Sequence, residues 1–178
     1  VGVALTDGGQ DVMLFSSGGR AVRFTETSVR AMGRNACGVR GMRLGAGERV
    51  ISLIIAEPGK VLTVTENGFG KCTPVDEYPI KGRATMGVIS IKTGERNGAV
   101  VGAVLVNDEH EVMLITSGGT LVRTPVAGVS VMSRNTQGVG MIRLSKRERL
   151  IGIARIETLG GDDNGGDPAP GPEEKSEE

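Results

Sequence analysis

Short apolar runs, each bounded by glycines and charged residues, recur along most of the chain. The runs are rich in Val, Ile and Leu, as β-strands typically are. A helical period of 3.6 residues is not sustained over any long stretch, so little helix is expected. The pattern predicts an all-β fold.

Three segments have the same pattern of an apolar strand, a tight turn and a second strand. They are "DVMLFSSGGRAVRF" (11–24), "KVLTVTENGFGKCT" (60–73) and "EVMLITSGGTLVRT" (111–124). Each turn contains glycine, which adopts the positive φ angles that two-residue hairpin turns need. The chain therefore contains a repeat, with offsets of 49 and then 51 residues.

Each repeat continues with two more apolar runs. The third predicted strands are "GVRGMRL" (38–44), "GVISIK" (87–92) and "GVGMIRL" (138–144). The fourth are "RVISLIIA" (49–56), "AVVGAVLV" (99–106) and "RLIGIARI" (149–156). Four strands in about 50 residues are typical of one blade of a β-propeller.

These boundaries divide the chain into three blades and two flanking segments. Residues 1–10 read as the last strand of a preceding, truncated blade, because "VGVALT" matches a fourth strand with no blade in front of it. Propellers ordinarily have four to eight blades, so we expect further repeats ahead of this segment. The predicted organisation is 1–10, 11–56, 57–106, 107–156 and an acidic tail, 157–178.

The formal net charge of zero conceals two unlike parts of the chain. Residues 157–178 carry eight acidic residues against one lysine, with many glycines and prolines, and this composition predicts disorder. Residues 1–156 carry 20 Lys and Arg against 13 Asp and Glu. The predicted folded part is basic, and its tail either solubilises the protein or competes with a bound polyanion.

A basic motif recurs with the repeat, as "RNACGV", "RATMGV" and "RNTQGV". Its arginines, Arg34, Arg83 and Arg134, lie in long connections between the second and third strands, and regularly spaced arginines suit the regularly spaced phosphates of duplex DNA. The alternative is that these arginines only solvate the edge of a blade. The remaining candidate contacts are Arg30, Lys81, Arg20, Arg23, Lys71, Arg123, Arg40, Arg43 and Arg143.

Other chemistry has little support in the sequence. Aromatic residues are scarce and Trp is absent, whereas proteins that bind single strands stack bases on aromatic rings. Tyr78 has no nearby acidic cluster to hold magnesium, so we expect it to pack, and His110 reads as a solvated turn residue. Cys37 and Cys72 form no metal motif and are expected to pack. No apolar run is long enough to cross a membrane.

Three long segments carry a family resemblance. They are "TSVRAMGRNACGVRGMRL" (27–44), "TENGFGKCTPVDEYPIKGRATMGVISIK" (65–92) and "SRNTQGV" (133–139). Together they resemble the C-terminal domain of DNA gyrase A, over essentially residues 1–156. The related domain of topoisomerase IV is similar too, but these segments and the acidic tail favour gyrase. The family's Gln-Arg-Gly-Lys box and about half of its repeats do not occur in this chain.

The resemblance implies a six-bladed, pinwheel-type propeller whose basic rim wraps and bends double-stranded DNA. It implies that the basic connections reach from one blade onto the next. The chain would be a non-catalytic, cytoplasmic part of an ATP-dependent type II topoisomerase that introduces negative supercoils into the chromosome. The partners would be DNA, the rest of gyrase A, and gyrase B, with the catalytic tyrosine, ATP and magnesium elsewhere in the enzyme and no cofactor here. A scaffold propeller that binds acidic proteins is the alternative.

Overall fold

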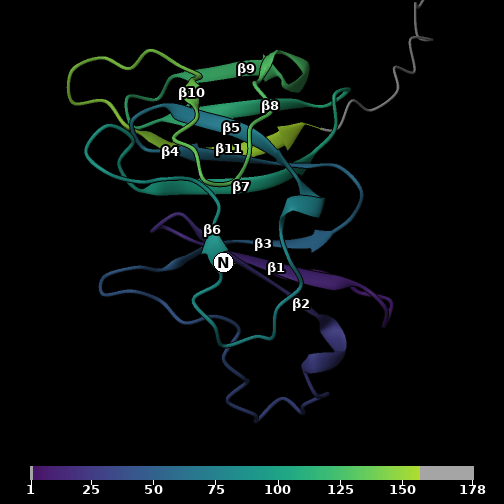
Figure 1. Cartoon of the computed structure of the whole chain (residues 1–178). Helices are drawn as coiled ribbons and strands as arrows, with labels where there is room; N and C mark the ends of the chain where they lie inside the picture. The colour runs from purple at the N-terminus through teal and green to yellow at the C-terminus, as the bar shows by residue number, and fades with distance from the viewer. Residues whose placement is uncertain (1, 157–178) are drawn as a thin grey trace, which may run out of the picture.

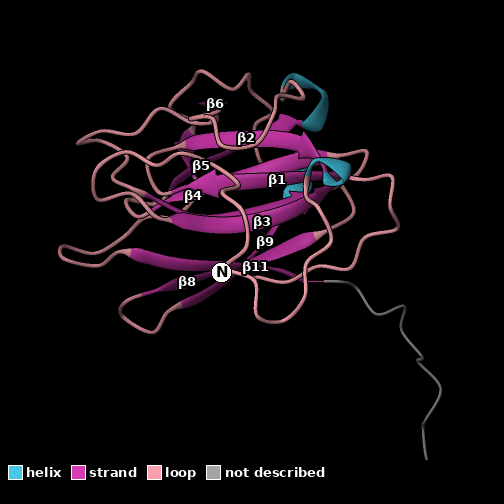
Figure 2. Ribbon diagram, turned by 90° about the horizontal axis from the view of Figure 1, so that it is seen from below, coloured by secondary structure: helices cyan, strands magenta, loops and turns pink. Residues whose placement is uncertain are grey.

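The structure, a computed structural model, describes residues 2–156 and consists of three antiparallel sheets (Figures 1 and 2). The first sheet has the order β3 (Val50–Ala56), β1 (Asp11–Ser16), β2 (Arg20–Thr25) and β6 (Val88–Ile89). The second has the order β10 (Val139–Gly140), β5 (Phe69–Pro74), β4 (Lys60–Thr65) and β7 (Val100–Val106). The third contains β11 (Leu150–Ile156), β8 (Glu111–Thr116) and β9 (Leu121–Pro125).

Short 3₁₀ turns follow the second strand of each hairpin, and the described residues contain no α-helix. The turns are η1 (Glu26–Ser28), η2 (Val75–Glu77) and η3 (Val126–Gly128). The predicted all-β fold of antiparallel, blade-like sheets is confirmed.

The sheets do not follow the boundaries of the sequence repeats. β6 belongs to the second repeat but pairs with β2 of the first, with Ala21 opposite Val88. β10 belongs to the third repeat but pairs with β5 of the second, with Gly70 opposite Val139. Each complete sheet therefore combines three strands of one repeat with one short strand of the next. We call β6 and β10 the exchanged strands, and their pairing with the preceding repeat the exchange.

The three sheets stack through two apolar layers. The strands β3, β7 and β11 contact one another in series, which puts the exchanged strands β6 and β10 at the opposite, outer edges. One layer contains Phe15, Val61 and Tyr78, between the first and second sheets. The other contains Leu62, Cys72 and Leu114, between the second and third sheets. The middle sheet is consequently covered on both faces.

Tyr78 packs within the first apolar layer, where it is almost completely buried. Its ring meets that of Phe15 edge to face at 5.9 Å between centroids, and its hydroxyl hydrogen-bonds the Ser90 hydroxyl at 2.8 Å. Burial raises the pKa of this phenol. Tyr78 is a packing residue, as the sequence predicts.

Three expectations need correction. The third strands are much shorter than predicted, and the first repeat keeps only an isolated bridge, at Met42. Residues 2–7 form no strand, and Val3 and Leu5 are almost fully exposed. Cys37 is exposed in its connection, whereas Cys72 is buried as expected. The predicted disorder of 157–178 lies outside the described residues.

The exchange depends on a glycine in the recurring Gly-Val dipeptide. Gly87 and Gly138 have φ of 68° and 73°, a conformation that residues with a Cβ rarely adopt. A Cβ on Gly138 would lie 2.6 Å from the carbonyl oxygen of Gly70, and one on Gly87 would overlap that of Ala21. The incoming chain thus contacts the preceding hairpin too closely for any side chain.

Replacing Gly87 by alanine should lower the free energy of unfolding by about 2–4 kcal/mol, because left-handed strain and overpacking add. Gly47→Ala is the matched control, since Gly47 has φ of 75° and open space around its Cα. It should cost only about 1–2 kcal/mol, the strain alone. Urea denaturation measures both, and equal losses would contradict the importance of the close contact.

Candidate nucleic-acid interface

Two of the three motif arginines bind the preceding repeat. Arg83 donates from Nε to the carbonyl oxygen of Ser28 at 3.0 Å and from Nη1 to that of Arg40 at 3.2 Å. Arg134 donates from Nη1 to the carbonyl oxygen of Ile89 at 3.2 Å. Both guanidinium groups therefore hold a connection of one repeat against the preceding repeat. The periodicity of the sequence does not distinguish this role from a contact with phosphate.

Arg34 is the equivalent residue in the first repeat and has no such neighbour. Its side chain is exposed, with no hydrogen bond or ion pair to the described residues. The three arginines thus share a sequence position but not an environment.

The arginines of the hairpin strands also bind other groups of the chain. Arg23 pairs through Nε with Asp11 Oδ2 at 2.8 Å, and both side chains are largely buried. Its Nη1 also donates to the carbonyl oxygen of Val75, in the next repeat. Arg123 pairs with Glu111 but remains exposed. Arg23 therefore serves the contact between repeats, whereas Arg123 keeps access to solvent.

Lys71 is fully buried and faces no solvent. Its ammonium donates to the Thr73 hydroxyl and to the carbonyl oxygen of Ser133, 2.9 Å away. Burial lowers the pKa of Lys71 to about 8, against the opposing attraction of Glu77. Lys71 was a candidate phosphate contact, but its position inside the middle sheet removes it from the interface.

A different basic position is exposed in all three repeats. Arg43, Lys92 and Arg143 lie near the end of the third apolar run of each repeat, at the repeat spacing, and all three side chains are solvent-exposed. The backbone N–H groups of Arg43 and Lys92 both donate to a carbonyl oxygen of the next connection, Thr85 and Thr136, at 2.8 Å. The backbone is thereby held while the three cationic groups make no ion pair with the described residues.

Sequence reasoning had included Arg43 and Arg143 but missed Lys92, although the offsets of 49 and 51 residues connect all three. Arg30, Arg40 and Lys81 are exposed as well, and Arg20 is half-buried. The structure adds a basic turn before β11, where Lys146, Arg147 and Arg149 are exposed. The exposed cations therefore follow the connections and the outer edges of the sheets.

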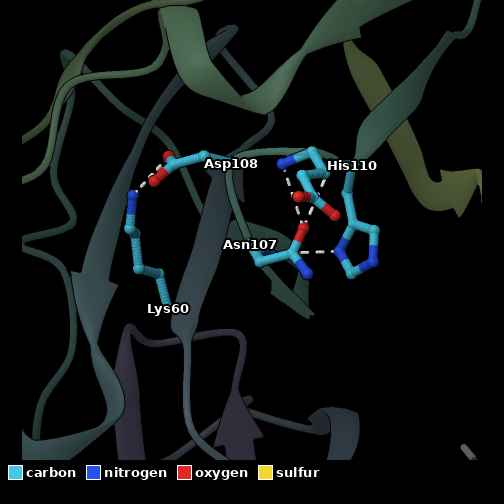
Figure 3. A network of polar contacts seen from close by, with 5 residues as sticks. Lys60, Asn107, Asp108 and His110 are labelled. Carbon is cyan, nitrogen blue, oxygen red and sulfur yellow. Dashed lines mark hydrogen bonds and ion pairs between the residues drawn. The ribbon is translucent and has the colours of Figure 1, made fainter.

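His110 has a structural role in the turn between β7 and β8 (Figure 3). Its Nδ1 accepts a hydrogen bond from the backbone N–H of Asn107 at 3.0 Å, and the Asn107 side chain accepts one in return from the His110 N–H at 3.1 Å. Lys60 pairs with Asp108 in the same turn.

Residues 2–156 hold no group of three acidic, His or Cys side chains placed to bind a metal. No helix in this part of the chain has the length and apolar character needed to cross a membrane.

The burial of Lys71 predicts a pH dependence of stability. Its pKa is about 8 when folded and near 10.5 when unfolded, so the unfolded chain binds more protons between these values. Stability should rise as the pH increases from 8 to 9, and Lys71→Met should abolish this rise in urea denaturation. Above pH 9 the trend should weaken, because burial also raises the pKa of Cys72, to about 11. A rise that persists in Lys71→Met would contradict this assignment.

Arg83 and Arg43 lie in different environments, so replacing each by alanine should change the free energy of unfolding by different amounts. Arg83→Ala should lower the free energy of unfolding by about 1–3 kcal/mol, because two backbone carbonyls lose charged donors. Arg43→Ala should stay within about 0.5 kcal/mol, since its side chain binds nothing in the described structure. Thermal and urea denaturation measure both effects. An unchanged free energy of unfolding in Arg83→Ala would show that Arg83 does not stabilise the contact between the repeats.

Comparisons with known proteins agree with this architecture. The sequence model described as "DNA gyrase C-terminal domain, beta-propeller" matches residues 10–57, 59–107 and 110–157. The chain is 57% identical to DNA gyrase A of Salmonella typhimurium over 157 residues, and 54% identical to that of Pseudomonas aeruginosa over 165. These alignments cover 88% and 92% of the chain but only 18% of each relative.

Two solved structures have the same fold. A DNA gyrase A C-terminal domain superposes with a TM-score of 0.79 at 25% identity, covering 85% of this chain and 52% of that one. A C-terminal domain of DNA topoisomerase IV superposes with a TM-score of 0.81 at 25% identity, covering 86% and 49%. The shape alone does not separate the two enzymes, but the sequence matches to gyrase A do, and the family resemblance is confirmed. The chain belongs to the family of DNA gyrase C-terminal domains with a β-propeller fold.

Proposed function

We propose that this chain binds double-stranded DNA through the phosphates, along the outer edges of its sheets. The observation that carries the proposal is the exposed basic position repeated as Arg43, Lys92 and Arg143. Each cation that meets a phosphate releases condensed counterions, which supplies affinity without reading the base sequence. Arg30, Arg34, Arg40 and Lys81 extend this basic surface into the connections.

The described aromatic residues favour duplex over single-stranded nucleic acid. Phe15, Phe24 and Tyr78 are buried in the core, and the ring of Phe69 is covered by the Arg96 guanidinium at 4.2 Å. Residues 2–156 therefore offer no free ring on which an unpaired base could stack. A rigid basic surface instead suits a helix whose phosphates have a fixed spacing.

The membership in the gyrase family supports a specific purpose for this binding. The surface would bend and wrap DNA and present a segment to the cleaving part of the enzyme, so that strand passage introduces negative supercoils. In this proposal the chain itself is non-catalytic and holds no cofactor. The rest of gyrase A, together with gyrase B, supplies its protein partners, in the cytoplasm and on the chromosome, and ATP and magnesium act in those other parts.

Fluorescence anisotropy of a duplex of about 40 base pairs across a salt series tests the interface. In the triple variant Arg43→Ala, Lys92→Ala and Arg143→Ala, the log-log salt slope should become shallower by about 0.9 for each cation removed from a phosphate, about 2.7 in all. Affinity at low salt should fall in parallel. The free energy of unfolding should not change, because these side chains bind nothing in the described structure.

The control variant, Arg43→Lys with Arg143→Lys, keeps all three charges and should keep the slope. An unchanged slope in the triple alanine variant would refute the proposed contacts. The absence of binding even at low salt, in a chain shown to be folded, would instead support the alternative scaffold function. The same titration without residues 157–178 tests whether the acidic tail competes with DNA, since its removal should then tighten binding.

A further inference from the structure

The turns of each repeat gather at two opposite ends of its strands. At one end, which we call the hairpin end, the hairpin turn bonds the turn before the fourth strand. The Ser17 N–H donates to the Arg49 carbonyl at 2.9 Å, and the Ser117 N–H donates to the Arg149 carbonyl at 2.8 Å. The opposite end, which we call the 3₁₀ end, holds η1, η2 and η3, drawn in cyan in Figure 2.

The three sheets have their hairpin ends on the same side. The N–H of Val100, at the start of β7, donates to the carbonyl of Ser17 in the first sheet at 2.8 Å. The N–H of Leu150, at the start of β11, donates to the carbonyl of Glu66 in the second sheet at 2.8 Å. The hairpin ends therefore form one continuous surface. Strands of about six residues separate this surface from the 3₁₀ end by about 20 Å.

The two ends carry exposed charges of opposite sign. The turns of the hairpin end have one exposed acidic residue, Glu95, against six exposed cations: Arg49, Lys92, Arg96, Lys146, Arg147 and Arg149. The turns of the 3₁₀ end have the exposed acids Asp7, Glu57, Asp76, Asp108 and Glu109, and the exposed cation on this side is Arg155, near the end of β11. The basic surface of the described residues thus extends over one end only.

The other carboxylates of the hairpin end point into its turns. Glu148 accepts hydrogen bonds from the Thr116 hydroxyl and from the Ser145 N–H, and these bonds lower its pKa. Its equivalent, Glu48, lies so close to the hairpin turn that a Cβ on Gly18 would be 2.0 Å from its Oε1. Both carboxylates are half-buried, so they do not cancel the exposed cations around them.

Arg49 and Arg149 are fixed by their backbone and free at their side chains. Their N–H groups donate to the hydroxyls of Ser17 and Ser117, at 3.1 and 3.0 Å. Their carbonyls accept from the same serines, yet neither guanidinium has a hydrogen bond or ion pair within the described part of the chain. In the second repeat Arg96, the equivalent of Arg147, supplies the cation of the turn. Each turn therefore presents at least one cation on a fixed backbone.

We propose that the duplex lies over the hairpin end of the blades, where these turns supply a second row of phosphate contacts next to Arg43, Lys92 and Arg143. The inference rests on the DNA binding proposed above and specifies the path of the DNA. The two rows are a few residues apart in the chain, so one duplex can meet both. The acids of the 3₁₀ end lie about 20 Å away, beyond the screening length of about 8–10 Å, and repel phosphates only on their own side.

The salt series tests the second row in the intact chain. Arg49→Gln with Arg149→Gln should make the log-log salt slope shallower by about 1.8, which is about 0.9 for each lost phosphate contact. Lys60→Gln with Arg155→Gln is the matched control, because it removes the same charge from the side of the 3₁₀ end. The control should keep the slope of the wild-type chain, and urea denaturation verifies that both variants are folded.

A slope unchanged in Arg49→Gln with Arg149→Gln, or lowered equally in both variants, would overturn the inference. The proposed function would still stand if the wild-type chain bound DNA in a salt-dependent way and the Arg43, Lys92 and Arg143 variant lost this dependence. A folded wild-type chain that binds no duplex at low salt would refute both.

Tethered cleavage locates the DNA without removing any charge. Single cysteines replace Ala46, at the hairpin end, or Thr27, at the 3₁₀ end, in a Cys37→Ser background; both positions are exposed, and Cys72 is buried. An iron chelate on each cysteine generates hydroxyl radicals that cut nearby deoxyribose. The label on Ala46→Cys should cut the bound duplex several-fold more than that on Thr27→Cys. Equal cleavage, or stronger cleavage from Thr27→Cys, would contradict the proposed path.

Discussion

The backbone contact between each exchanged segment and the hairpin of the preceding repeat is the constraint on which the rest depends. It is a contact of main chain with main chain, at Ala21 with Val88 and at Gly70 with Val139. Only glycine fits immediately before those valines, because the carbonyl of the hairpin occupies the space of a Cβ. Once this contact forms, the long connections, the positions of Arg83 and Arg134 and the outer edges of the sheets all follow.

This constraint divides the basic residues into two groups with different physical roles. Arg83 and Arg134 donate hydrogen bonds to carbonyl oxygens of the preceding repeat. Arg43, Lys92 and Arg143 follow the crossing, where the backbone is fixed and the side chains extend into solvent. A forked, weakly hydrated guanidinium suits the first role, while any mobile cation suits the second. The presence of lysine among the exposed three is consistent with that difference.

Much of the fold could be predicted from the sequence, since local sequence patterns indicate the hairpins, the repeat spacing and the apolar fourth strands. The exchange could not be derived from those patterns, because nothing local at Val88 says that its partner is Ala21 rather than a strand of its own repeat. The burial of Lys71 was missed for a similar reason. Its equivalents, Val22 and Val122, are apolar, and this comparison would have indicated an inward-facing position. For the site, charge spacing found the right connections but could not separate arginines bound to carbonyls from arginines in solvent.

The offset between the repeated sequence and the folded sheet has a consequence for how such a chain can lengthen. Every sheet takes its last strand from the next repeat, so a stretch of about 50 residues duplicated in register brings both the segment that completes its predecessor and the edge that receives its successor. The position of the breakpoints does not matter, because any cut one repeat long restores the same set of contacts. A fold connected in this way can gain or lose whole blades by recombination without a new interface having to arise.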